Sequence, residues 1–118
     1  MGGFTDPRGA RVGLGALLVG HFTHAGLTFA GKVGTGFDTK LLRELRARLD
    51  ALEVATSPFT QGSGLPRAGV HWVRPELVVQ VAFMEWTGHN HIRHPSFQGM
   101  RADKKPRDVK REESSEAE

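Results

Sequence analysis

The sequence predicts an all-β fold with one helix, arranged as a small five-stranded barrel. Short runs rich in Val, Leu and Phe alternate with turn residues such as Gly, Pro and Asn. One segment, 38–52, has apolar residues at helical spacing. The 118 residues contain no internal repeat, so they have room for one domain with a modest core.

Two strands are expected in the first third of the chain. Residues 14–23 form an apolar, partly alternating run, and residues 27–33 form a second one. Between them, His24, Ala25 and Gly26 predict a short hairpin connection.

A helix is expected to begin after Asp38, whose carboxylate can cap its N-terminus. Phe37, the residue before the cap, is placed to pack against Leu42 in the helix. The helix must end before Pro58, because the residue before a proline avoids the helical conformation. Residues 56–69 are rich in Gly, Pro and Ser, which predicts a long loop. The apolar helix positions share one face: Leu41, Leu42, Leu45, Leu49 and Leu52.

Three further strands complete the prediction. Residues 70–73 and 77–87 are rich in Val, Phe and Trp, and residues 91–100 form a last strand that Pro95 interrupts or places at an edge. Five short strands and one helix fit a partly open Greek-key barrel of the OB type, which binds nucleic acids on one face. An SH3-like barrel is the structural alternative. The aromatic residues of these strands are expected in the core: Trp72, Phe83 and Trp86.

We expect the folded domain to cover residues 1–105 and to be followed by a charged, disordered tail, 106–118. The net charge of +3 points to an anionic partner. No apolar run reaches the roughly 20 residues that span a bilayer, and no secretory signal pattern is present, so a soluble, intracellular protein without a membrane partner is expected. Because cysteine is absent, disulfides and thiolate metal sites are excluded.

Two local patterns do not indicate sites. Residues 26–32 match the start of a phosphate-binding P-loop, but Val33 replaces the Ser or Thr that would hold magnesium, and the segment has the pattern of a strand. His89, His91 and His94 form the one metal-like cluster, but a strand places His94 on the face opposite His89 and His91. We therefore predict no metal site.

Five segments, taken in chain order, carry a family resemblance: GALLVG (15–20), GKVGTGF (31–37), WVRPELV (72–78), RHPxF (93–97) and RxDK (101–104). In chain order they resemble the C-terminal region of ATP-dependent DNA ligases, and they are similar to the ligase module of bacterial multifunctional end-joining ligases. The last segment also resembles the final signature motif of the covalent nucleotidyltransferases, which include DNA ligases and mRNA capping enzymes. The resemblance covers about residues 3–105.

The resemblance implies a part in ATP-dependent ligation that this chain does not carry out alone. The family's Lys-x-Asp-Gly motif, whose lysine becomes adenylated, is absent from the sequence. An adenylation domain, in cis or as a separate chain, is therefore the expected partner, and it would bind most of the ATP and Mg²⁺, with no cofactor held tightly here. Arg101 and Lys104 are the implied donors to the ATP pyrophosphate. Asp103 either orients a cation or the metal, or forms a local charge pair.

The resemblance also implies binding to nicked duplex DNA by a protein that works in the cytoplasm, in association with the nucleoid. Lys32, Arg74 and Arg93 are the candidate phosphate contacts. In related ligases the residue before the proline of the RxPxF segment faces the minor groove beside the nick and is commonly aromatic. Here it is His94, which could insert there or hydrogen-bond a sugar or phosphate. The alternative function is an autonomous OB-fold module that binds single-stranded nucleic acid.

Overall fold

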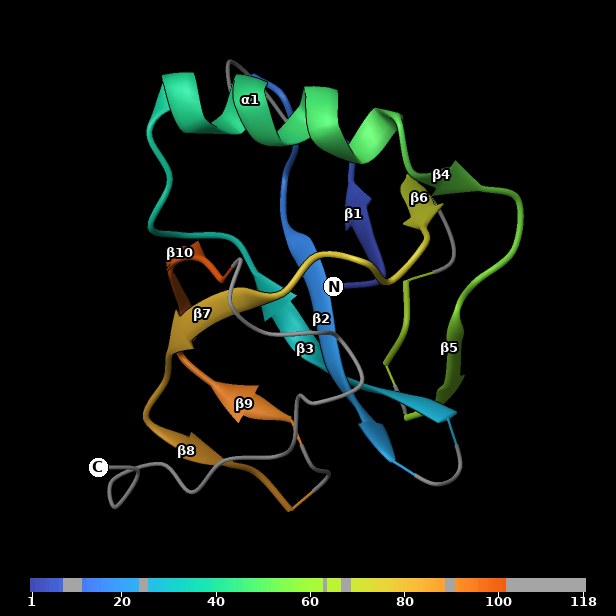
Figure 1. The fold of residues 1–118 in the computed structure, drawn as a ribbon. Coiled ribbons are helices and arrows are strands. Elements are labelled where there is room, and N and C mark those ends of the chain that lie inside the picture. Colours follow the sequence, from blue (N-terminus) through green and yellow to red (C-terminus); the bar gives the residue numbers. More distant parts are fainter. Residues whose placement is uncertain (8–11, 24–25, 63, 67–68, 89–90, 102–118) are drawn as a thin grey trace.

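The computed structural model describes residues 1–7, 12–23, 26–62, 64–66, 69–88 and 91–101. Within these ranges the chain forms ten short strands and one helix (Figure 1). The predicted class, mostly strands with a single helix, is confirmed. The expected tail, 106–118, lies outside the described residues.

Six of the strands form one sheet in the order β4-β6-β1-β2-β3-β5. All neighbours are antiparallel except β3 and β5, which are parallel. Among the described residues the strands do not close into a barrel, because the remaining four form separate pairs. The sheet strands are β1 (Gly3–Thr5), β2 (Leu17–Thr23), β3 (Gly26–Val33), β4 (Glu53–Val54), β5 (Phe59–Gln61) and β6 (Val70–Val73).

The two remaining pairs are both antiparallel. β7 (Val79–Ala82) pairs with β10 (Ser96–Met100), and β8 (Glu85–Trp86) pairs with β9 (Ile92–Arg93). These four strands gather on one side of the molecule, away from β4 and β6 (Figure 1).

The helix α1 (Thr39–Asp50) lies across one end of the large sheet (Figure 1). As predicted, Asp38 is its N-cap, and its carboxylate accepts a hydrogen bond from the Leu41 amide at 2.8 Å. Leu42, Leu45 and Leu49 are buried because the helical period places them on one face. The ring of Phe37, just before the cap, stacks on Phe97 of β10 at 5.0 Å, so it links the helix start to that strand.

Apolar clusters form on both faces of the sheet. Side chains alternate along β2, so Leu17 and Val19 join the cluster beneath α1, whereas Leu18 joins the opposite one. Each cluster buries residues that are distant in sequence. The first contains Met1, Phe4, Leu14, Leu17, Val19, Val33, Leu42, Leu45, Leu49, Val73 and Phe97, and the second contains Leu18, Leu27, Phe29 and Phe59.

The second face corrects one prediction. Residues 56–69 are not a continuous loop, because β5 lies within them and pairs with β3. Phe59 of β5 is buried and packs edge-on against Phe29 at 5.4 Å between ring centroids. Burial of this aromatic ring stabilises a short strand. The Gly- and Ser-rich residues on either side of it have the pattern of a loop, so the sequence does not indicate this strand.

The expected number of five strands is not confirmed. The run 77–87 is one strand by pattern but two in the structure, because β7 and β8 have different partners. The run 91–100 likewise divides at His94 and Pro95 into β9 and β10. Trp72, Phe83 and Trp86 are half-buried rather than buried. Trp72 packs against the second cluster, and Phe83 and Trp86 pack edge-on against each other at 5.5 Å between centroids.

Candidate nucleic-acid interface

Two segments about 60 residues apart lie side by side. The Phe97 amide donates to the carbonyl of Thr35 at 2.9 Å, and the Thr35 hydroxyl donates to the carbonyl of Pro95 at 3.2 Å. At the other end of the contact, Gly31 packs against Ile92. The segments 31–36 and 92–97 therefore run along each other, and we call their joint surface the 31–36/92–97 seam.

Gly36 makes this close approach feasible. Its φ is 93°, a backbone conformation that L side chains rarely adopt. A Cβ atom there would lie 2.5 Å from the carbonyl oxygen of Phe97 and 2.7 Å from its nitrogen. Only glycine fits between the two segments without moving one of them.

Three of the four predicted DNA-binding residues belong to the two segments of the seam and are exposed. Lys32 is exposed on β3 next to Gly31, and Arg93 and His94 are exposed next to Ile92. Two cations and an imidazole on one surface can neutralise phosphates and hydrogen-bond a sugar edge.

Arg93 is held loosely. Its Nε lies 3.3 Å from Oε2 of Glu85, which is directly opposite on β8, and both side chains are about half exposed. Exposed ion pairs of this kind contribute about 0.2–1 kcal/mol. The guanidinium can therefore exchange the carboxylate for a phosphate at small cost.

His94 has an unusual backbone. Its φ is 53°, and it is the one non-glycine residue in the described ranges with a positive φ. This left-handed conformation costs roughly 1–2 kcal/mol for a residue with a Cβ atom. It turns the chain sharply between β9 and β10 and leaves the imidazole exposed.

Arg74 lies elsewhere. It follows β6, its amide donates to the carbonyl of Leu52 at 2.9 Å, and its Nε lies 3.3 Å from Oε2 of Glu76. Two strands, β1 and β2, separate β6 from β3 in the sheet. The structure therefore does not bring Arg74 to the seam.

Arg101 is the one residue of the predicted pyrophosphate motif that the structure describes. It is half-buried directly after β10, and its amide donates to the carbonyl of Val78 at 2.8 Å. This bond extends the pairing of β10 with the segment that leads into β7. Asp103 and Lys104 lie outside the described residues, as does His89 of the histidine cluster.

A charged triad that the sequence analysis missed lies on the large sheet. His71 contacts two carboxylates: Nε2 lies 2.6 Å from Oδ1 of Asp6, and Nδ1 lies 3.1 Å from Oε2 of Glu53. Its ring also stacks on Phe4, 4.9 Å between centroids. The hydrogen bonds to Glu53 and Asp6 raise the pKa of His71, because only the doubly protonated imidazolium donates to both.

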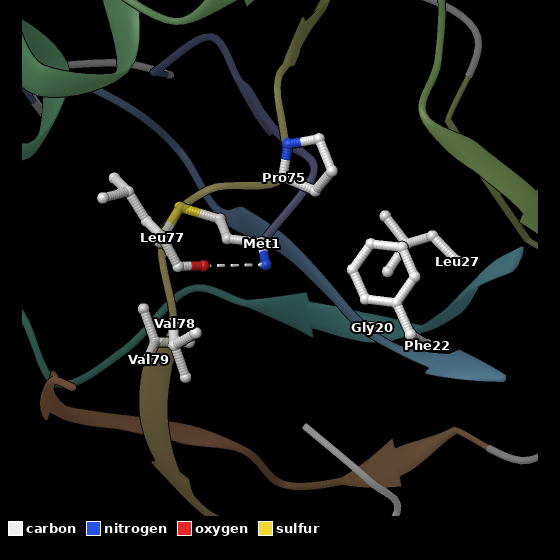
Figure 2. A pocket seen from close by; sticks show the side chains of 8 residues that line it. All are labelled: Met1, Gly20, Phe22, Leu27, Pro75, Leu77, Val78 and Val79. Carbon is white, nitrogen blue, oxygen red and sulfur yellow. Dashed lines mark hydrogen bonds between the residues drawn. The ribbon is translucent and has the colours of Figure 1, made fainter. Parts of the chain in front are cut away.

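A small apolar pocket opens near the N-terminus (Figure 2). The Met1 amino group donates to the carbonyl of Leu77 at 3.2 Å, and burial lowers its pKa to about 6. The pocket encloses about 30 Å³. That volume holds about one water molecule, so it does not fit a nucleotide. Its lining residues are Met1, Gly20, Phe22, Leu27, Pro75, Leu77, Val78 and Val79.

Known proteins are similar in sequence to this chain over most of its length. The multifunctional non-homologous end joining protein LigD of Pseudomonas aeruginosa is 39% identical over 111 residues, which are 91% of this chain and 13% of that protein. LigD of Mycolicibacterium smegmatis is 42% identical over 113 residues, 92% of this chain and 15% of that protein. The chain thus spans a small part of these relatives. No helix among the described residues is long and apolar enough to cross a membrane.

Solved structures agree with the sequence comparison. The ligase domain of Mycobacterium tuberculosis LigD matches with a TM-score of 0.86 and 40% identity over 95% of this chain and 37% of that chain. Mycobacterial DNA ligase D complexed with ATP and MES matches with a TM-score of 0.82 and 39% identity over 95% of this chain and 36% of that chain. The match to the ligase domain confirms the predicted OB fold. The family described as the ATP-dependent DNA ligase C-terminal region matches residues 10–104, and this chain belongs to that family.

Proposed function

We propose that this chain is the OB domain that binds nicked duplex DNA and completes the adenylation site of an ATP-dependent DNA ligase. The observation that supports the DNA-binding part is the 31–36/92–97 seam, whose two adjoining segments carry the exposed residues Lys32, Arg93 and His94. Cations on such a surface release counterions from the DNA backbone when they neutralise its phosphates. His94, at the sharp turn between β9 and β10, supplies a hydrogen-bonding or inserting group beside them.

Arg101, Asp103 and Lys104 carry the adenylation part of the proposal. When ATP reacts with the partner's lysine, negative charge develops on the departing pyrophosphate, and positioned cations stabilise it. Arg101 directly follows β10 and its amide bonds to the Val78 carbonyl, so strand pairing fixes the backbone at the start of this motif. Mg²⁺ and most contacts to ATP belong to the partner, in keeping with a pocket here that holds only one water molecule.

The partner is an adenylation domain, joined in cis or supplied as a separate chain. It must provide the nucleophilic lysine, because this sequence contains no Lys-x-Asp-Gly motif. The isolated chain is therefore expected to form no stable AMP adduct with ATP and Mg²⁺. The proposed place of action is the cytoplasm, on nucleoid DNA.

Fluorescence anisotropy tests the DNA-binding part. It measures how tightly the isolated chain binds nicked duplex, intact duplex and single strands of one sequence over a series of salt concentrations. Lys32→Ala and Arg93→Ala should each weaken binding to nicked duplex and reduce its salt slope by about 0.9. Arg43→Ala, which removes an exposed arginine on α1, is the control and should leave the slope unchanged. Preference for single strands, with no response to either seam variant, would instead favour the autonomous single-strand module.

A further inference from the structure

His71 connects three neighbouring strands near one edge of the large sheet (Figure 1). His71 belongs to β6, Asp6 directly follows β1, and Glu53 begins β4. Nε2 of the imidazole lies 2.6 Å from Oδ1 of Asp6, and Nδ1 lies 3.1 Å from Oε2 of Glu53. One ring therefore holds the segments on both sides of β6.

Of these three strands, β4 has the fewest backbone partners. It is two residues long, it ends the strand order, and it pairs with β6 alone. One flanking bond adds to this pairing: the Arg74 amide donates to the carbonyl of Leu52 at 2.9 Å. Because a short edge strand makes few hydrogen bonds, the contact between Glu53 and His71 supplies a large share of what holds β4 in place.

Asp6 is held more firmly than Glu53. Its amide donates to the carbonyl of Gly69 at 2.8 Å, and β1, which it follows, pairs with β2 on one side and β6 on the other. Its carboxylate also makes the shorter of the two contacts with the ring.

The number of protons on the ring decides how many of these contacts can exist. The imidazolium has an N–H on each nitrogen, so it donates to both carboxylates, whereas the neutral ring has one N–H and one lone pair. A lone pair that faces a carboxylate is repelled, so one contact must open when the ring loses a proton. Since Asp6 has the shorter contact and the firmer backbone, Nε2 keeps its proton and Glu53 is released.

The charged groups that face His71 come from three elements. Within the described ranges they are Asp6 after β1, Glu53 on β4 and, on α1, Arg46, whose guanidinium lies 4.9 Å from the centroid of the Phe4 ring on which His71 stacks. The two carboxylates contact the imidazole directly, whereas Arg46 faces it only by way of Phe4. The hydrogen bonds to Glu53 and Asp6 therefore raise the pKa of His71 above its ordinary value of 6.5.

We propose that His71 is a proton-dependent latch at the edge of the sheet: the imidazolium holds β4 against β6 through Glu53, and the neutral ring releases it. The latch is closed below pH 6.5 and opens as pH rises through the folded-state pKa of His71. Its release frees β4 locally and uncovers the outer edge of β6, while β6 stays paired with β1. The latch does not depend on DNA binding by the domain.

Hydrogen exchange of single amides in the full chain, followed by NMR, tests the latch. The Arg74 amide, bonded to Leu52, reports opening of β4, and the Asp6 amide, bonded to Gly69, reports the other side of β6. Protection of the Arg74 amide should not respond to low denaturant concentrations, because a local opening exposes little surface. This protection should fall about 3- to 10-fold as His71, followed by its ring signals, loses its proton. Protection of the Asp6 amide should change less.

Two substitutions should remove this pH dependence. In Glu53→Gln the new amide can accept from the imidazolium or donate to the neutral ring, so β4 stays held in both states. In Asp6→Asn the new amide can donate to Nε2, which leaves the proton of the neutral ring on Nδ1 for Glu53. Glu44→Gln makes the same change as Glu53→Gln at an exposed position on α1, so it is the matched control and should keep the pH dependence of the original chain.

The contrary outcomes are equally specific. If exchange at Arg74 responds to denaturant as steeply as exchange at the Gly2 amide, which is bonded to Leu18 between β1 and β2, then β4 opens only with the whole fold and the proposal fails. The proposal also fails if protection at Arg74 does not follow the His71 titration, if the Asp6 amide loses more protection, or if Glu53→Gln keeps the full pH response. Denaturant-insensitive exchange at Arg74 whose pH dependence both substitutions abolish would establish the latch.

Discussion

Nε of Arg93 and Oε2 of Glu85 lie 3.3 Å apart across the β8–β9 pair, and Arg74 and Glu76 are separated by the same distance elsewhere on the surface. All four side chains are 52–56% exposed. Solvent screens such pairs, so neither contributes much to folding. Under the proposed function, each glutamate would compete with any DNA phosphate that its arginine meets.

Replacing Glu85 by Gln should strengthen binding to nicked duplex. The change frees Arg93 and removes a negative charge beside the DNA, which should tighten binding about 2- to 5-fold at low salt and less at high salt. Glu76→Gln makes the same change next to Arg74, so it measures whether that arginine also meets DNA. Because β1 and β2 separate β6 from the seam, we expect the smaller gain there. Unchanged or weaker binding by Glu85→Gln would show that Arg93 meets no phosphate.

Gly36→Ala should destabilise the fold and separate the two segments of the seam. Its Cβ would meet the Phe97 backbone at 2.5 Å in a φ of +93°, which we expect to lower the free energy of unfolding by about 1–3 kcal/mol. Gly88→Ala is a matched control, since no atom lies within 4 Å of the added Cβ. Denaturant unfolding of both variants measures the difference, and equal stability would contradict the seam geometry.

Local signals in the sequence were enough to predict the helix and the strands that have strong apolar patterns. Asp38 caps α1 as expected, because an N-cap depends on one side chain and the next few amides. The runs around Leu18 and Phe29 are β2 and β3, since each is long enough to show an apolar pattern.

Elements set by distant contacts were not predictable. β1 has only three residues in a glycine-rich segment, and β5 is three residues within an apparent loop; both are stabilised by partners far away in the sequence. The triad of His71 with Asp6 and Glu53 joins residues 65 and 18 positions apart, so no spacing reveals it. The resemblance gave the DNA-binding candidates, but only the fold shows that Arg74 lies apart from Lys32 and Arg93.

The His71 triad should make stability depend on pH. Because the folded-state pKa of His71 is raised above 6.5, its stabilising contribution is complete below that value and is lost as pH rises through the folded pKa. The free energy of unfolding should therefore fall as pH rises from 6.5 through the folded-state pKa of His71. His71→Gln should remove this part of the pH dependence. Asp6→Asn with Glu53→Gln should return the His71 pKa, followed by NMR, toward its ordinary value. His94→Asn is the control, and an unshifted His71 pKa in the original chain would refute the coupling.

The last prediction concerns the two catalytic steps and requires the chain joined to, or mixed with, its adenylation partner. Arg101→Ala and Lys104→Ala should slow enzyme adenylation by about 100- to 1,000-fold, because each removes a donor to the departing pyrophosphate. Sealing of a pre-adenylated nick should stay near normal in both variants, since the pyrophosphate has already left. Arg93→Ala and His94→Asn should show the reverse: adenylation continues, and sealing slows because the DNA contact is lost.

If the four residues changed in these variants only support the fold, both steps should be impaired together. The Arg101 amide holds β10 to Val78, and His94 sets the sharp turn between β9 and β10, so a purely structural role predicts that both residues act through the fold alone. Alanine keeps the backbone amide at 101, and asparagine tolerates the left-handed conformation at 94, so these variants spare both structural features. Adenylation rate, sealing rate and melting temperature should then be measured for each variant. Equal losses in both steps that follow a lower melting temperature would rule out the division of labour, whereas opposite losses at an unchanged melting temperature would establish it.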